Sequence, residues 1–138
     1  MKSMILYDPK NSEESQVRFK INFPDVKLFF ASRIEDIFGY TDKDPNLIVM
    51  EAEVPKEDKG IILGNKRIRS PFLVIKNLKD YSFVIYTRGT KEKKVEDLKK
   101  SFSKLNIEVV HKDIEQNEFL RIFSRYFLDF SKAKIKRF

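Results

Sequence analysis

"LIVMEAEVP", residues 47–55, contains the pattern that decides the fold. Leu47 to Met50 are all apolar, and an unbroken apolar run is typical of a strand covered on both faces, as in a parallel sheet. Glu51 interrupts the run, and Pro55 follows four positions later. We therefore expect a strand over 46–54 that presents a carboxylate near its end. That carboxylate is either a solvated acid at a strand tip or part of a site.

Four further segments have strand character, and helical patterns separate them. Strands are expected at 3–8, 26–32, 82–87 and 107–112. The first helix should begin near Asn11, the second after a cap at Ser32, and the third after the Ser70-Pro71 pair. Two more helices are expected at 91–105 and 115–131. A tight turn at Gly64-Asn65 predicts a small hairpin that joins 61–63 to 66–68.

Strand and helix thus alternate five times, without a linker or an internal repeat. The economical fold is a five-stranded parallel sheet with helices on both faces, flavodoxin-like in the order 2-1-3-4-5. We expect one domain over 1–131, followed at 132–138 by a basic tail or the start of a linker helix. Sites in such sheets form beyond the carboxyl ends of the strands. The residues expected at those ends are Asp8, Ser32, Glu51, Thr87 and Lys112.

The composition restricts the classes of function. The chain has 138 residues, no cysteine, and a net charge of +7 from 28 basic and 21 acidic residues. Part of this surplus lies in the last seven residues, which favours a solvated tail or truncated linker over a nucleic-acid arm. No apolar run is long enough to cross a membrane, so we expect a soluble, cytoplasmic protein. The few glycines form no phosphate-binding loop, and no nucleophile motif is present, so no enzymatic activity is expected.

The strand-end residues resemble those of response-regulator receiver domains, the phosphate-accepting modules of two-component signalling. "MILYD" supplies Asp8, "LIVMEAEVP" supplies Glu51 with Pro55, "FVIYTRG" supplies Thr87, and "VVHKD" supplies Lys112. The resemblance implies that Asp8 corresponds to a residue that holds Mg²⁺ and Glu51 to the phosphoaccepting Asp. It also implies that Thr87 and Lys112 contact phosphate oxygens.

The sequence departs from that family at several of these positions. Glu51 is one methylene longer than Asp, and Asp8 lies between Tyr7 and Pro9 without an acidic neighbour. Val109 occupies the position where many receivers carry a switching aromatic residue. We therefore expect an atypical receiver (a pseudo-receiver) that binds Mg²⁺ weakly at most, has no other cofactor, and signals independently of phosphorylation. The alternatives are a competent phospho-receiver and a basic α/β nucleic-acid-binding domain.

Two structural expectations follow for the pocket and for the last helix. Glu51 should lie within ion-pair reach of Lys112 as a partly exposed pair, with Thr87 turned inward, if its carboxylate imitates a phosphorylated Asp. The last helix holds more apolar residues than a single stripe needs, which indicates either a wide core helix or an exposed face for a homodimer or protein partner. The residues proposed for that face are Phe119, Phe123, Tyr126 and Phe127. An output domain in a longer chain, itself able to contact nucleic acid, is also compatible with this reading.

Overall fold

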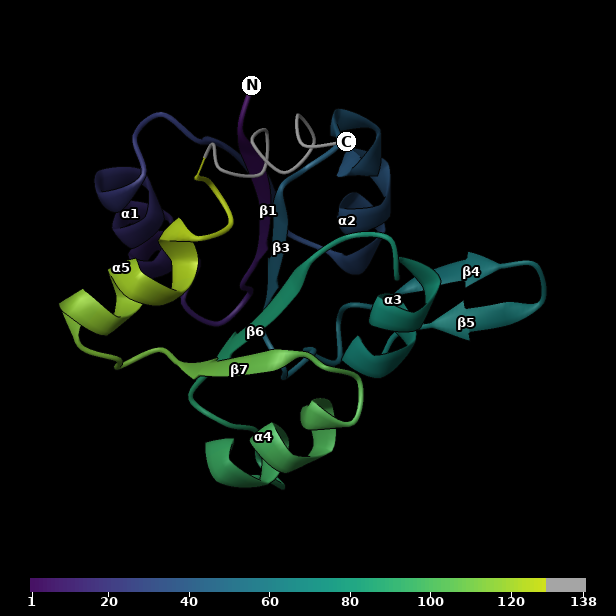
Figure 1. Cartoon of the computed structure of the whole chain (residues 1–138). Coiled ribbons are helices and arrows are strands. Elements are labelled where there is room, and N and C mark those ends of the chain that lie inside the picture. The colour runs from purple at the N-terminus through teal and green to yellow at the C-terminus, as the bar shows by residue number, and fades with distance from the viewer. Residues whose placement is uncertain (129–138) are drawn as a thin grey trace.

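The computed structural model describes residues 1–128, and its centre is a five-stranded parallel sheet (Figure 1). The strands follow the order β2-β1-β3-β6-β7, which is the expected order once the inserted hairpin β4-β5 is set aside. The sheet strands are β1 (Ser3–Tyr7), β2 (Lys27–Ala31), β3 (Leu47–Met50), β6 (Phe83–Thr87) and β7 (Glu108–His111). The predicted flavodoxin-like fold is confirmed.

Helices cover both faces of this sheet. They are α1 (Ser12–Asn22), α2 (Ile34–Tyr40), α3 (Pro71–Asn77), α4 (Val95–Ser103) and α5 (Gln116–Ser124), with a 3₁₀ turn η1 (Thr41–Lys43) after α2. The side chains of α1 and α5 share one core cluster, and those of α2, α3 and α4 share the other. No helix within residues 1–128 is long and apolar enough to cross a membrane.

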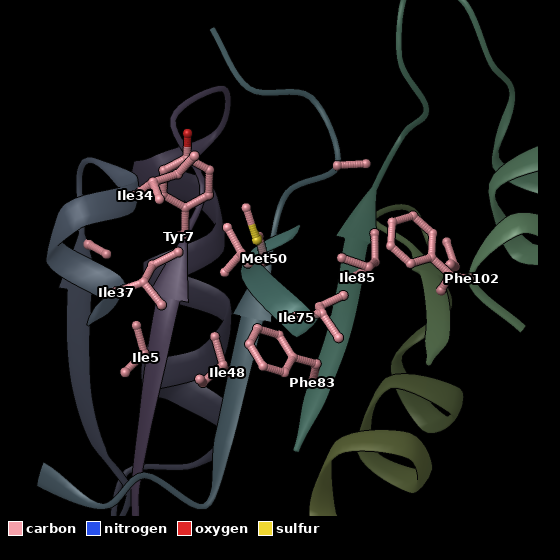
Figure 2. Packing of buried hydrophobic residues seen from close by; sticks show 14 of the residues in the cluster. Ile5, Tyr7, Ile34, Ile37, Ile48, Met50, Ile75, Phe83, Ile85 and Phe102 are labelled. Atoms are coloured by element: carbon pink, nitrogen blue, oxygen red, sulfur yellow. The ribbon is translucent and has the colours of Figure 1, made fainter. Parts of the chain in front are cut away.

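The central strands are apolar on both sides because each side faces a helical layer. Ile5 and Ile48 pack toward α2 and α3, as Figure 2 shows, whereas their neighbours Met4 and Leu47 pack toward α1 and α5. This alternation follows from the two-residue period of side chains along a strand. The unbroken apolar run in β3 is therefore the consequence of burial on two faces.

Several element boundaries differ from the sequence-based expectation. The third strand ends at Met50 rather than at residue 54, so Glu51 begins the loop that follows it. Ser32 does not cap α2: Arg33 is the N-cap residue, and the Asp36 carboxylate accepts hydrogen bonds from both Ser32 and Arg33. Ser70 does cap α3, since its hydroxyl accepts a hydrogen bond from the amide of Leu73.

The last helix corrects the expected partner face. Phe119 and Phe123 are completely buried against the Phe19 ring of α1, and Phe127 is 5% exposed and packs on the Phe23 ring that follows α1. Only Tyr126 of the four proposed residues is partly exposed. Their apolar surplus therefore fills the core between α1, α5 and the sheet. The helix itself ends at Ser124, and residues 129–131 of the expected helix lie outside the described residues, as does the basic tail at 132–138.

The hairpin is an insertion between β3 and α3, and it projects beyond the helical layer (Figure 1). Its strands are β4 (Ile61–Leu63) and β5 (Lys66–Ile68), joined by Gly64-Asn65 as predicted. At its base, Ile68 is 2% exposed and belongs to the core. Gly60 has a φ of +72°, and a Cβ there would lie 2.1 Å from the carbonyl oxygen of Ile68, so only glycine fits this close approach.

A buried carboxylate fixes the hairpin base to the rest of the domain. The Asp58 carboxylate accepts hydrogen bonds from the Tyr7 hydroxyl at 2.8 Å and from the backbone amides of Ile34 and Gly60 at 2.9 Å each. The guanidinium of Arg69 donates to the carbonyl oxygens of Asp58 and Pro55, both at 2.8 Å. Burial, reinforced by the bond to Asp58, raises the pKa of the Tyr7 hydroxyl well above its ordinary value.

Candidate functional site

Four side chains converge at the carboxyl edge of the sheet, where the sequence places them. Asp8 follows β1, Glu51 follows β3, Thr87 ends β6, and Lys112 follows β7. These strands run parallel, so their carboxyl ends meet at one edge. All four residues are at least 96% buried. Ser32, at the end of β2, does not hydrogen-bond to any of them; its hydroxyl donates to Asp36 instead.

The Lys112 ammonium is the centre of the site. It donates to Glu51 Oε1 at 2.7 Å, to Asp8 Oδ1 at 2.9 Å and to Asn11 Oδ1 at 3.0 Å. An ammonium has three protons, so these three bonds use its whole donor capacity. The pair with Glu51 differs from the expectation in one respect: its side chains are 1% and 2% exposed rather than partly exposed. The contact is therefore a buried ion pair.

The second oxygen of Glu51 is held from the opposite side. Thr87 Oγ1 donates to Glu51 Oε2 at 2.6 Å, and the backbone amide of Glu53 donates to the same oxygen at 2.9 Å. The Thr87 hydroxyl in turn accepts a hydrogen bond from the amide of Gly89 at 3.0 Å. Glu51 thus connects Lys112 and Thr87 through one carboxylate, and the Thr87 side chain points inward.

Asp8 is equally well satisfied by protein groups. Its Oδ1 accepts from Lys112 and from the backbone amide of Asn11 at 3.0 Å, and its Oδ2 accepts a short hydrogen bond from the Ser15 hydroxyl. Two carboxylates and one ammonium leave a formal charge of −1 in this buried network. The hydrogen bonds from neutral donors compensate for the lost hydration of the carboxylates.

The residues present do not fit the Mg²⁺ site that the receiver fold implies. Hard divalent cations require free carboxylate oxygens. Here the oxygens of Asp8 and Glu51 are occupied by protein donors, and Lys112 lies between the two carboxylates. Within residues 1–128, no group of three or more acidic or histidine side chains is arranged to hold a metal ion. A cation bound between the two carboxylates would compete with the Lys112 ammonium for their oxygens.

Glu53, two residues beyond Glu51, connects two loops above the pocket. Its carboxylate accepts from the Lys10 ammonium at 2.7 Å and from the backbone amide of Lys91 at 2.8 Å. The bond to Lys10 is the main reason that the pKa of the Glu53 carboxyl is lowered. The backbone of the 88–91 loop requires glycine at position 89, where φ is +103° and an added Cβ would lie 2.9 Å from the carbonyl oxygen of Lys93. The 88–91 loop is consequently held toward the pocket.

Sequence reasoning missed three residues at the start of α1 and within it that complete the site. Asn11 is the N-cap residue of α1, but its side chain makes no capping bond and instead accepts from Lys112. Ser15 binds Asp8, and Arg18 donates to the carbonyl oxygens of Lys112 at 3.0 Å and Ile114 at 2.8 Å. The spacing 11, 15, 18 follows the helical period, so these polar residues share one face of α1. This polar face is the sequence pattern that could have identified the three residues.

Comparisons with known proteins agree with the geometry of the fold. Neither a protein-family model nor a curated protein matches the sequence. The structure is similar to a response-regulator receiver domain protein from Clostridium thermocellum, at 12% identity over 98% of each chain with a TM-score of 0.65. It is also similar to the signal receiver domain of a DNA-binding response regulator (merR) from Colwellia psychrerythraea, at 11% identity over 91% of this chain and 97% of that one, with a TM-score of 0.68.

A third similar structure is RcsB from Salmonella enterica serovar Typhimurium, bound to promoter rprA in the presence of the phosphomimetic BeF₃⁻. It is 12% identical, covers 93% of this chain and all of that one, and gives a TM-score of 0.66. At such identities, structural likeness establishes the fold. The chain has the fold of response-regulator receiver domains, and Asp8, Glu51, Thr87 and Lys112 lie together at the carboxyl edge of its sheet.

Proposed function

We propose that this protein is an atypical receiver-type signalling module that acts through protein contacts, without phosphorylation and without enzymatic activity of its own. The carrying observation is that one carboxylate, Glu51, binds both Lys112 at 2.7 Å and Thr87 at 2.6 Å. In a receiver, the resemblance assigns those two partners to the phosphoryl group. Glu51 supplies a permanent negative charge to both of them.

The extra methylene of Glu51 supports this role. Glutamate extends its carboxylate about 1.5 Å farther than aspartate does, roughly one C–C bond length, so its oxygens reach toward the space of an acyl phosphate. The oxygens then engage the same lysine and hydroxyl that would stabilise that phosphate. A pocket of this kind holds the 88–91 loop inward constantly, and signalling would be controlled by abundance or by partner binding.

Phosphorylation is disfavoured by the same contacts. Transfer of a phosphoryl group to a carboxylate requires a free oxygen and a cation that neutralises the developing charge. Both oxygens of Glu51 are hydrogen-bonded, and the carboxylates of the pocket share the Lys112 ammonium. We therefore propose that the module works without Mg²⁺ or any other cofactor.

Acetyl phosphate with Mg²⁺ tests this proposal directly. Wild type and Glu51→Asp are incubated with the phosphodonor, and the mass of the intact protein is measured. We expect no phosphoryl adduct on either chain, because Glu51→Asp restores the acceptor but leaves the metal site with the single acid of β1, Asp8. Asp113→Asn, which changes an exposed acid outside the pocket, is the matched control. A stoichiometric adduct on wild type would identify a competent phospho-receiver and refute the proposal.

A contact surface for a partner is available beside β7. A groove of about 740 Å³ lies between α4, β7 and α5, and its lining includes the apolar Ile107, Val109 and Ile122. The polar residues His111 and Arg121 also line it. We propose that a cytoplasmic protein partner, or the output domain of a longer chain, binds this face. Nucleic acid would then be contacted only through that partner.

A further inference from the structure

The hairpin segment, residues 59–69, carries the whole positive surplus of the described domain. Residues 1–128 contain 24 basic and 20 acidic side chains, and the hairpin segment contains four basic and no acidic ones. The rest of the described chain is therefore balanced. Lys59, Lys66 and Arg67 are exposed, whereas Arg69 is partly buried at the hairpin base. Localised charge of this kind steers an oppositely charged partner to one place on the surface.

The hairpin also exposes apolar side chains beside its cations. Ile62 is 57% exposed and lies opposite Arg67, while Leu63 is 38% exposed and lies opposite Lys66. Directly paired residues of an antiparallel ribbon project from the same face. Each face of the hairpin end thus presents one aliphatic side chain next to one cation. Because buried residues anchor the hairpin base, this surface is fixed before any partner binds.

A complementary surface exists on the same chain, at residues 34–44 of α2 and η1. This acidic segment contains Glu35, Asp36, Asp42 and Asp44 against the single cation Lys43, and Arg33, directly before it, pairs with Glu35 at 2.6 Å. Among the described residues, no ion pair involves Asp42 or Asp44, and both are exposed. The partly buried rings of Phe38 and Tyr40 lie within the same segment. Carboxylates and aromatic rings there match the cations and aliphatic side chains of the hairpin segment.

We propose that the hairpin segment of one molecule docks on the acidic segment of a second copy, and that the contact is reciprocal. The hairpin and α2 lie on the same side of the sheet (Figure 1), with the α2 amide of Ile34 bonded to Asp58 at the hairpin base. Two patches on one side of a molecule can meet twice across a two-fold axis. Pairing of hairpin with hairpin would instead oppose four cations with four. The contact is independent of the state of the Glu51 pocket.

Sedimentation equilibrium of the full chain measures this association. Wild type is expected to form dimers, and raising the salt from about 0.05 M to about 0.5 M, which shortens the Debye length roughly threefold, should weaken them. The variant Lys66→Glu/Arg67→Glu should raise the dissociation constant at least about tenfold, since it opposes acids with acids. Glu35→Lys/Asp42→Lys should do the same by opposing cations with cations.

Mixing the two reversed variants provides the decisive measurement. In the mixed dimer, both reciprocal contacts regain opposite charges, so association should return to near the wild-type strength although each variant alone is expected to associate at least about tenfold more weakly. Circular dichroism confirms that both variants are folded. Lys99→Glu, which reverses an exposed cation on α4 away from both segments, should leave the association unchanged.

Several outcomes would overturn the proposal. Wild type could stay monomeric at high concentration, or both charge-reversal variants could dimerise as strongly as wild type. A mixture of the two variants that stays monomeric would also contradict it. Salt-sensitive binding of the hairpin to duplex DNA or to vesicles with anionic lipid, lost in Lys66→Glu/Arg67→Glu while dimerisation is absent, would assign the cations to another polyanion and would equally refute a second copy.

Discussion

Glu51 and Asp58 are two buried carboxylates seven residues apart, and the fold satisfies them in different ways. Each accepts three hydrogen bonds. Glu51 receives one from the ammonium of Lys112, one from the hydroxyl of Thr87 and one from the backbone amide of Glu53. Asp58 receives two from backbone amides and one from the Tyr7 hydroxyl, and none of the cations within residues 1–128 donates to its carboxylate. Glu51 is thus held by a charge pair together with two neutral donors, and Asp58 by neutral donors alone.

The different donors give the two carboxylates different roles: Glu51 belongs to a pocket, and Asp58 is a structural anchor. A carboxylate paired with an ammonium can exchange that partner, because another anion can compete for the same cation. A carboxylate held by backbone amides has donors that cannot move unless the chain itself rearranges. The Glu51 contact can therefore change its partner, while Asp58 fixes the hairpin to β1 and α2. Five substitutions test this contrast.

The largest effect is expected for Lys112→Met. Removal of the ammonium leaves Asp8 and Glu51 buried without their shared cation, and loss of one partner of a buried pair costs about 3–5 kcal/mol. Urea denaturation measures the loss of unfolding free energy. Lys99→Met, which removes an exposed pair with Glu96, should change it by no more than about 0.5 kcal/mol. A small loss at Lys112 would mean that water reaches the pocket and hydrates both carboxylates.

Asp58→Asn should have the next largest effect. Tyr7 and Ile34 donate to one carboxylate oxygen and Gly60 donates to the other. Asparagine replaces one of these oxygens with an amide nitrogen, which cannot accept, so at least one donor loses its partner. That loss costs about 1–3 kcal/mol. Hydrogen exchange should quicken at the base of β4 and β5 and leave the Glu51 pocket unchanged. If the pocket amides quicken equally, the anchor and the pocket form one cooperative unit.

Tyr7→Phe tests the same anchor through pH. Because the pKa of Tyr7 is raised in the folded state, its contribution to stability is complete below the ordinary tyrosine value near 10 and is lost as pH rises above it, when the unfolded chain releases the proton first. Wild type should therefore lose stability above about pH 10 more steeply than Tyr7→Phe. Equal slopes for the two proteins, in denaturation series run at several pH values, would contradict the assignment.

Glu53→Gln should have the smallest effect on stability, about 0–1 kcal/mol, because its bond to Lys10 lies near the surface. The clearer effect of Glu53→Gln should be on hydrogen exchange in the 88–91 loop. Without the charged acceptor, the Lys91 amide should exchange faster with solvent, while the Glu51–Lys112 pair stays intact. Glu51→Gln should loosen the same loop by weakening the contact to Thr87. If the Lys91 amide exchanges at the wild-type rate in both variants, the loop is held by other contacts.

The sequence alone determined the elements and the edge at which the site forms. Apolar runs bounded by polar residues identified all five strands of the sheet, and their alternation with helices implied the strand order. Once the strand ends were known, Asp8, Glu51, Thr87 and Lys112 followed as neighbours, because parallel strands end at one edge. The Gly64-Asn65 turn and the Ser70 cap were also readable, since both depend on interactions within a few residues.

Only the tertiary structure decided which polar groups meet and which apolar groups are buried. The bond from Lys112 to Asp8 spans 104 positions of sequence, and the bond from Tyr7 to Asp58 spans 51. Periodicity has no information about such partners. The same limit applies to Phe119 and Phe123: a broad apolar helix reads identically whether its surplus faces a partner or an aromatic cluster. Phe119 and Phe123 are buried because the ring of Phe19 on α1, roughly 100 residues earlier, packs against both of them.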